Sequence, residues 1–139
     1  MKIFTIGYGG RSREDLVGLL QKNEVKTVVD VRLRPDRASM GIWVKAKTPD
    51  KGIEKTLTEA GIKYRSLIEL GNIFLEFEDW QDSYRLLLET SGELLTRRLS
   101  GLPGPICLMC AEKSVSQCHR QQIAEYLAKN KEADVRHLE

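Results

Sequence analysis

The chain has 139 residues, enough for one domain built around one hydrophobic core, so we expect a single domain over residues 1–139. Hydrophobic residues make up 41% of the chain and charged residues 30%, a balance typical of a soluble globular protein. The formal net charge is only +2, so any basic surface must be local, and no apolar run approaches the roughly 20 residues that a membrane-spanning helix needs.

The first thirty residues read as a strand, a helix and a second strand. Residues 2–7 are a short β-rich run that stops at a glycine-rich breaker. Because this glycine interrupts the apolar run too early for a secretory signal, we expect a cytoplasmic protein. Ser12 is predicted to cap a helix that reaches to about residue 23. Residues 26–32 are apolar on both faces, which is typical of a parallel strand covered on both sides.

The rest of the chain continues the alternation of strands and helices. Residues 33–49 form a long connection, a kind of segment that is usually functional or mobile. The elements expected after it are a helix at 50–60, a strand at 62–67, a turn at 69–72, a helix at 78–99, a strand at 106–111, a helix at 114–130 and a last strand at 134–138. This order predicts an α/β fold, a mainly parallel sheet of about five strands with helices on both faces (Rossmann-like).

The loops that follow the strands are expected to gather at one edge of the sheet. Open α/β sheets bind their ligands at that edge. The segments placed there are residues 8–12, 32–35, 69–72 and 112–120. The last of them follows a strand that carries two of the three cysteines and itself contains a histidine and an arginine, so it is the strongest candidate for a site.

Arg120 stands out in the last predicted helix. A capping-box pattern predicts that this helix begins at Ser114. Arg120 then falls within the apolar stripe, and its side chain should point back toward the strand ends. A buried guanidinium needs a partner. The candidates are Glu112, Asp30 or an anion bound at the helix N-terminus, where the helix dipole favours negative charge.

Asp30 is the only polar centre in the second predicted strand. Strand alternation puts Asp30 and Arg32 on one face. A buried carboxyl must be paired, hydrogen-bonded or protonated. Two interpretations stay open: a structural ion pair between Asp30 and an arginine, or a carboxylate that takes part in catalysis or positions a ligand.

The three cysteines are an odd number, and two of them lie on one predicted strand, which favours reduced thiols over a disulfide framework. Cys107, Cys110, Cys118 and His119 have spacings that a metal site would suit. Alternation, however, sends Cys107 and Cys110 to opposite faces, and Cys107 is then core packing. Cys110 is either a packed thiol or a nucleophile, if an arginine or a helix N-terminus favours its thiolate. No cofactor is predicted.

The segment from residue 32 to 51 is basic and has a tryptophan in its middle. Arg34, Arg37, Lys45 and Lys47 surround Trp43. Cations beside an aromatic ring suit a sugar-phosphate backbone with base stacking, so nucleic-acid binding is one interpretation. The other is a solvated loop whose tryptophan is tucked into the core.

Several short stretches follow one another in a familiar order. They are Thr5-Ile6-Gly7-Tyr8-Gly9-Gly10-Arg11-Ser12, Val28-Val29-Asp30-Val31-Arg32 with Pro35, Gly61-Ile62-Lys63-Tyr64, Glu69-Leu70-Gly71, and Cys110-Ala111-Glu112 leading to Cys118-His119-Arg120. Together they resemble the DUF488 family, a domain of unknown function, over nearly the whole chain. The resemblance implies a small α/β domain with a polar cluster at one sheet edge. That cluster is Arg11, Ser12, Asp30, Arg32, Tyr64, Glu69, Cys110, Glu112, Cys118, His119 and Arg120.

The chain departs from the family pattern at three places. Tyr8 stands where the family often has a histidine, Ser66 lies in the dipeptide where a second histidine often occurs, and Asn72 replaces a glycine. Losing two imidazoles removes the commonest general bases. This weighs against histidine-driven catalysis, although His119 remains.

Three functions compete on these observations. The first is binding, or acting on, a phosphate-bearing small molecule such as a nucleotide, with Arg11, Arg32 and Arg120 converging around one hollow. Its ligand-binding candidates are Arg11, Ser12, Arg32, Tyr64, His119 and Arg120, and its catalytic candidates are Asp30, Glu69, Cys110 and Glu112. The second is a nucleic-acid accessory domain using Arg34, Arg37, Trp43, Lys45 and Lys47. The third is a metal site built on Cys107, Cys110, Cys118 and His119.

Overall fold

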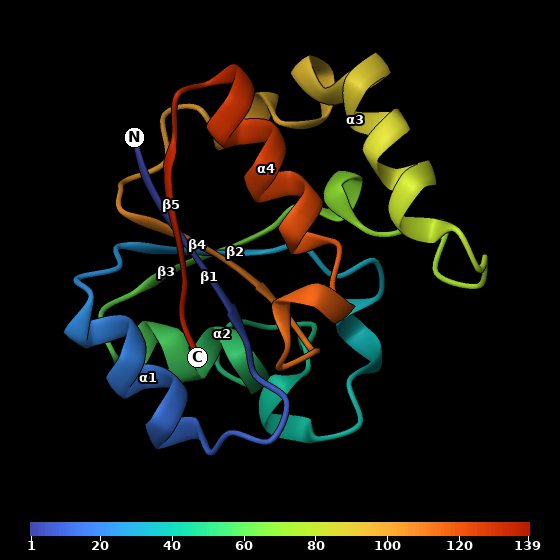
Figure 1. Cartoon of the computed structure of the whole chain (residues 1–139). Coiled ribbons are helices and arrows are strands. Elements are labelled where there is room, and N and C mark those ends of the chain that lie inside the picture. Colours follow the sequence, from blue (N-terminus) through green and yellow to red (C-terminus); the bar gives the residue numbers. More distant parts are fainter.

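Five parallel strands form one sheet in the computed structural model, which describes residues 1–139 (Figure 1). The strands are β1 (Lys2–Gly7), β2 (Thr27–Asp30), β3 (Lys63–Ser66), β4 (Ile106–Cys110) and β5 (Asp134–His137). Their order across the sheet is β3-β2-β4-β1-β5, and every neighbouring pair is parallel. The predicted α/β fold with a parallel five-stranded sheet is therefore confirmed.

Two helices cover each face of the sheet (Figure 1). They are α1 (Arg13–Lys22) and α2 (Gly52–Glu59) on one face, and α3 (Trp80–Leu95) and α4 (Arg120–Asn130) on the other. Each face has its own hydrophobic core, and the three central strands are almost wholly buried between the two. This double covering is why these strands lack a polar alternation. None of the helices has the length and apolar character needed to span a membrane.

Side-chain alternation along β4 divides its residues between the two cores. Ile106, Leu108 and Cys110 pack on the side of α3 and α4, whereas Cys107 and Met109 pack on the side of α1 and α2. The opposite facing of Cys107 and Cys110 is thus confirmed.

The predicted helix at 114–130 is wrong at its start. The chain makes a single 3-10 turn at Val115–Gln117, Cys118 is then extended with φ −132° and ψ 141°, and α4 begins at Arg120. The Ser114 hydroxyl contacts the Ser116 hydroxyl rather than a backbone N–H, so the capping box does not form. The local capping signal is overridden because the Cys118 side chain is buried and bonded to Cys110.

The predicted helix at 78–99 is shorter than expected, and it runs without a break through Gly92. Helix α3 ends at Leu95, and a 3-10 turn follows at Arg97–Leu99. Gly92 instead makes room for a neighbouring helix, because a Cβ atom there would lie 2.4 Å from the Tyr126 ring of α4.

Alanine at the two helical glycines is therefore expected to have opposite effects. Gly92→Ala should lower the free energy of unfolding by about 1–3 kcal/mol, because the Tyr126 ring must move out of a packed contact. Gly18→Ala on α1 should raise it by about 0.5–1 kcal/mol, because nothing lies within 4 Å of the added methyl group and alanine favours a helix. Urea unfolding of both variants tests this. Equal effects in the same direction would contradict the packing of α3 on α4.

Candidate ligand-binding site

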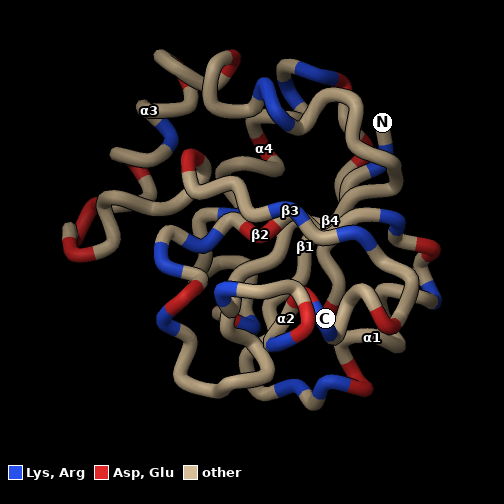
Figure 2. Tube along the Cα trace, turned by 180° about the vertical axis from the view of Figure 1, so that it is seen from behind, with Lys and Arg blue, Asp and Glu red and all other residues tan.

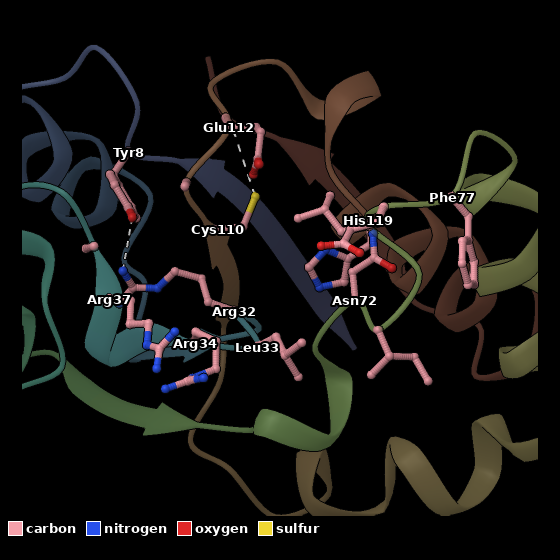
Figure 3. Close-up of a pocket in the computed structure, with 15 residues that line it drawn as sticks. Tyr8, Arg32, Leu33, Arg34, Arg37, Asn72, Phe77, Cys110, Glu112 and His119 are labelled. Carbon is pink, nitrogen blue, oxygen red and sulfur yellow. Dashed lines mark hydrogen bonds between the residues drawn. The ribbon is translucent and has the colours of Figure 1, made fainter.

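A cavity of about 480 Å³ opens at the carboxyl edge of the sheet (Figure 3). Its lining comes from the loops that follow β1, β2, β3 and β4, together with His119 just before α4. One side carries three guanidinium groups, and we call Arg32, Arg34 and Arg37 the arginine wall. The lining also includes the neighbouring residues Ile73, Leu75 and Phe77, which we call the apolar wall. The position is the one at which open α/β sheets bind ligands.

Arg32 is held rigidly by Asp30. The Arg32 Nη2 and Nε atoms donate to the two carboxylate oxygens at 2.7 and 2.8 Å, and the Arg32 backbone N–H donates at 3.1 Å. The Tyr64 hydroxyl donates to the same carboxylate at 2.5 Å. Asp30 is fully buried and is not part of the cavity lining. The structural ion pair is thus the interpretation that the geometry bears out, and Asp30 and Tyr64 act on the site through Arg32.

Charge and burial set the protonation states of Arg32 and Tyr64. Burial lowers the pKa of Arg32, but its hydrogen bond and charge interaction with Asp30 outweigh burial, so the pKa is raised above its usual value. Burial and the Asp30 carboxylate both raise the pKa of Tyr64. Arg32 therefore stays cationic and Tyr64 stays protonated at any ordinary pH.

The other two members of the arginine wall are exposed to solvent. Arg34 lies 3.4 Å from Asp36, and both side chains are about half exposed, so this ion pair is weak. The Arg34 hydrogen bond lowers the pKa of Asp36. Arg37 takes part in no salt bridge. These two guanidinium groups are consequently the ones free to contact a ligand.

Tyr8 connects the arginine wall to the core. Its hydroxyl accepts from Arg32 Nη1 at 3.0 Å, its ring lies 5.2 Å from the guanidinium carbon, and it stacks on Trp43 at 4.9 Å. Trp43 is only 2% exposed. Of the two interpretations of this segment, burial therefore bears out the one in which Trp43 is tucked into the core, and the indole is not free to stack on a base.

Only part of the basic segment lines the cavity. Arg34 and Arg37 belong to the cavity, whereas Lys45 and Lys47 lie outside its lining. Basic and acidic residues are interspersed around the molecule (Figure 2). The cavity therefore draws on the first part of the segment only.

Arg120 is buried, with 1% of its surface exposed, and points toward the strand ends as predicted. Its partners are not the carboxylates that were expected. Nη1 donates to the Glu112 carbonyl at 2.7 Å and to Cys110 Sγ at 2.7 Å, Nη2 donates to the Lys113 carbonyl at 3.1 Å, and Nε lies 3.3 Å from the Thr5 hydroxyl. Burial lowers the pKa of Arg120. The Arg120 side chain therefore connects α4 to the loop after β4 through these hydrogen bonds.

The predicted convergence of Arg11, Arg32 and Arg120 around one hollow is wrong. Arg11 donates to the Gly7 carbonyl at 2.8 Å and pairs with Asp15 at 3.2 Å. Arg11 and Arg120 are both absent from the cavity lining. Two arginines from the loop after β2 take their place beside Arg32.

Two other candidates lie away from the cavity. Ser12 caps α1 by accepting a hydrogen bond from the Asp15 N–H at 3.0 Å. Glu69 forms an ion pair with Arg98, with distances of 2.6 and 2.7 Å, and this hydrogen bond lowers the pKa of Glu69. Both residues stabilise local structure and do not face the ligand space.

Three reduced thiols were expected from the sequence, but only one cysteine is free in the structure. Cys110 and Cys118 are bonded as a disulfide, and Cys107 is free and buried. The proposed four-residue metal set is not assembled, because Cys107 faces the opposite core. Cys110, Glu112 and Cys118 do bring one potential ligand atom each within 4.8 Å of one another. They are the residues that could hold a metal ion after reduction.

His119 lines the cavity and is neutral in the folded protein. Its Nε2 atom lies 2.8 Å from the Val31 carbonyl, and because a carbonyl only accepts, Nε2 carries the proton. Its Nδ1 atom lies 3.7 Å from Cys118 Sγ. Burial lowers the pKa of His119 to about 4. The imidazole is thus oriented by the backbone rather than poised to move a proton.

The neutral state of His119 predicts a pH dependence of stability. The unfolded chain binds a proton at this residue near pH 6.5, and the folded chain binds it only near pH 4. The free energy of unfolding should therefore fall as the pH drops through this range, by at most about 3 kcal/mol from this residue. Burial also lowers the pKa of His137, so the measurement compares wild type with His119→Gln. Identical slopes for the two proteins between pH 6.5 and 4 would show that His119 is not the cause.

Several residues of the cavity were not predicted from the sequence. They include the apolar wall and Glu76, which lie outside the segments that were placed at this edge. The available signal was an apolar run directly after the 69–72 turn, to which no helix or strand was assigned. Ile73, Leu75 and Phe77 are 61%, 63% and 57% exposed, whereas Phe74 between them packs against the core.

Comparisons with known proteins give one match. A protein-family profile described as "Domain of unknown function DUF488" matches residues 12–127. No curated protein and no solved structure matches the chain.

Proposed function

Since the chain belongs to the DUF488 family, a domain of unknown function, we propose its function from the geometry of the site: the cavity binds a small phosphate-bearing molecule with an aromatic or apolar part, such as a nucleotide. One observation carries the proposal. Two exposed guanidinium groups, of Arg34 and Arg37, share a cavity of about 480 Å³ with three exposed apolar side chains. This volume suits a small ligand.

The arginine wall is the part of the cavity that would bind the phosphate of the ligand. Guanidinium groups donate two parallel hydrogen bonds to phosphate oxygens, and such charge-assisted bonds are among the strongest in proteins. Arg32 is fixed by Asp30 and Tyr8, and the Asp30 carboxylate balances its charge. Arg34 and Arg37 are the groups that reach the phosphate.

The apolar wall is the part of the cavity that would bind the aromatic or apolar part of the ligand. Exposed apolar residues that lie together mark binding surfaces more often than isolated ones do. Figure 3 shows Phe77 and His119 on the side of the cavity away from the arginine wall. An aromatic ring such as a base would cover the side chains of the apolar wall, which otherwise face water.

The carboxylates of the cavity are Glu76 and Glu112. Asp30 and Glu69, the other two carboxylates considered as catalytic, are committed to Arg32 and Arg98. If the bound ligand is turned over, Glu112 is therefore the acid–base candidate among the residues considered. Binding is the property to test first.

Titration calorimetry tests the proposal directly. Wild type is titrated with a nucleoside 5′-monophosphate, the triphosphate, the free nucleoside and inorganic phosphate. The Arg34→Ala/Arg37→Ala double variant should bind the nucleotides at least about tenfold more weakly, because it loses charge-assisted hydrogen bonds worth about 1.5–3 kcal/mol each. Phe77→Ala should weaken binding of the nucleotides but not of inorganic phosphate.

Two matched controls accompany the titration. Arg13→Ala/Arg85→Ala removes two exposed arginines that do not line this cavity, and binding should not change. Lys45→Ala/Lys47→Ala should also leave binding unchanged, whereas a nucleic-acid interface would be weakened. Absence of binding by wild type at millimolar ligand and low salt would refute the proposal.

A further inference from the structure

Cys110 and Cys118 place a disulfide at the base of the cavity. Cys110 is part of the cavity lining and Cys118 is not, although both side chains are almost fully buried. The dashed contact in Figure 3 marks Cys110 Sγ beside the Glu112 backbone, at the cavity end of β4. Of the two cysteines, Cys110 is therefore the one that a small molecule in the cavity meets first.

Arg120 gives this sulfur an unusual environment. The guanidinium is 1% exposed, and its acceptors are two backbone carbonyls, the Thr5 hydroxyl and Cys110 Sγ. A buried cation without an anionic partner is costly. Cys110 Sγ, at 2.7 Å, is the only one of these acceptors that can become negatively charged. Opening the disulfide would give Arg120 a thiolate partner, and a cation beside a thiol favours the thiolate.

Cys118, unlike Cys110, has no guanidinium group hydrogen-bonded to its sulfur atom. The Arg120 backbone N–H lies 3.4 Å from Cys118 Sγ, and the neutral His119 ring lies 3.7 Å from it. The Glu112 carboxylate lies within 4.8 Å of both sulfur atoms and is exposed. Glu112 can exchange protons with solvent because it is exposed, and His119 Nδ1 is a second proton acceptor beside Cys118.

We propose that Cys110 and Cys118 are a redox-active pair that undergoes thiol–disulfide exchange with small thiols entering the cavity. The thiolate of one small thiol attacks Cys110 Sγ, the Cys110–Cys118 bond breaks, and Cys118 leaves as a thiolate and takes up a proton. A second small thiolate attacks the sulfur of the first in the mixed disulfide. Cys110 then leaves as a thiolate beside Arg120, and two thiols have become one small disulfide. The reverse sequence oxidises the pair.

Mass spectrometry after alkylation measures this exchange, with glutathione as the probe. Protein purified without reductant is equilibrated in buffers of varied reduced-to-oxidised glutathione ratio and then alkylated. Cys110 and Cys118 should become alkylated together, in one two-electron transition. Cys107, buried on the other face of the sheet, is the internal control and should not change.

Two serine variants test which sulfur is attacked. With oxidised glutathione at pH 7, Cys118→Ser should form a mixed disulfide at Cys110 at least about tenfold faster than Cys110→Ser forms one at Cys118, because access and thiolate character both set the rate. Cys107→Ser should exchange as wild type does. The inference is separate from nucleotide binding, because neither measurement contains a nucleotide.

Three results would overturn the inference. The first is full alkylation of Cys110 and Cys118 in protein exposed to oxidised glutathione. The second is a pair that stays closed in excess reduced glutathione while the protein remains folded by circular dichroism. The third is one zinc ion per chain in the reduced protein, found by elemental analysis, that prevents oxidation of the pair, because Cys110, Glu112 and Cys118 would then be a metal site.

Discussion

Asp30→Ala is expected to lower the free energy of unfolding by about 3–5 kcal/mol, the usual cost of removing one partner of a buried ion pair. Asp30 is fully buried and accepts four hydrogen bonds, three from Arg32 and one from the Tyr64 hydroxyl. The variant leaves the buried Arg32 guanidinium without its counter-charge. Urea unfolding followed by circular dichroism measures the change.

Asp36→Ala is the matched control for this experiment. Asp36 also pairs with an arginine, but both side chains are about half exposed, so its loss should cost well under 1 kcal/mol. Asp30→Ala should also weaken ligand binding, because Arg32 loses its anchor. A stability loss as small as that of Asp36→Ala would show that Asp30 is not the anchor of Arg32.

Gly7→Ala is the second substitution expected to have a large effect. A Cβ atom at this position would lie 1.7 Å from the Glu112 carbonyl oxygen and 2.5 Å from the Glu112 carbonyl carbon. Neither backbone can easily move, because Gly7 pairs with Cys110 in the sheet and Arg120 holds the Glu112 carbonyl. We expect a loss of about 3 kcal/mol in the free energy of unfolding, at the upper end of overpacking effects.

Gly41→Ala provides the comparison for Gly7→Ala. At Gly41 nothing lies within 4 Å of the position that the alanine methyl group would occupy, so the substitution should change stability by less than about 0.5 kcal/mol. Thermal unfolding of both variants distinguishes the two cases. If Gly7→Ala were as stable as Gly41→Ala, the close approach of the β1 and β4 loops would be incorrect.

The fold followed from the sequence because hydrophobic periodicity reflects burial. Val28, Val29 and Val31 near β2 and residues 106–110 of β4 put apolar side chains on both faces, and both segments lie between two helical layers. The start of α4 could not be predicted from the sequence, because the Ser114 capping signal reports only on neighbouring residues. The burial of Cys118 against Cys110, which overrides that signal, is a contact between residues on separate elements.

The site was predicted in part. The carboxyl edge of the sheet and the Asp30–Arg32 pair followed from topology and strand alternation. The hydrogen-bond partners of Arg120 could not be predicted in this way. Helical periodicity gives the direction of a long side chain but not the backbone carbonyls to which it donates. The apolar wall was missed for a related reason: its residues are exposed, and burial patterns report only on residues that the fold covers.

A crystal structure of the protein grown with a nucleoside 5′-monophosphate tests the central claim most directly. The account predicts the phosphate between the guanidinium groups of Arg34 and Arg37, with the base against Phe77 and Leu75. A phosphate bound instead beside Arg11, or a nucleotide held by Lys45 and Lys47 with the cavity empty, would contradict it.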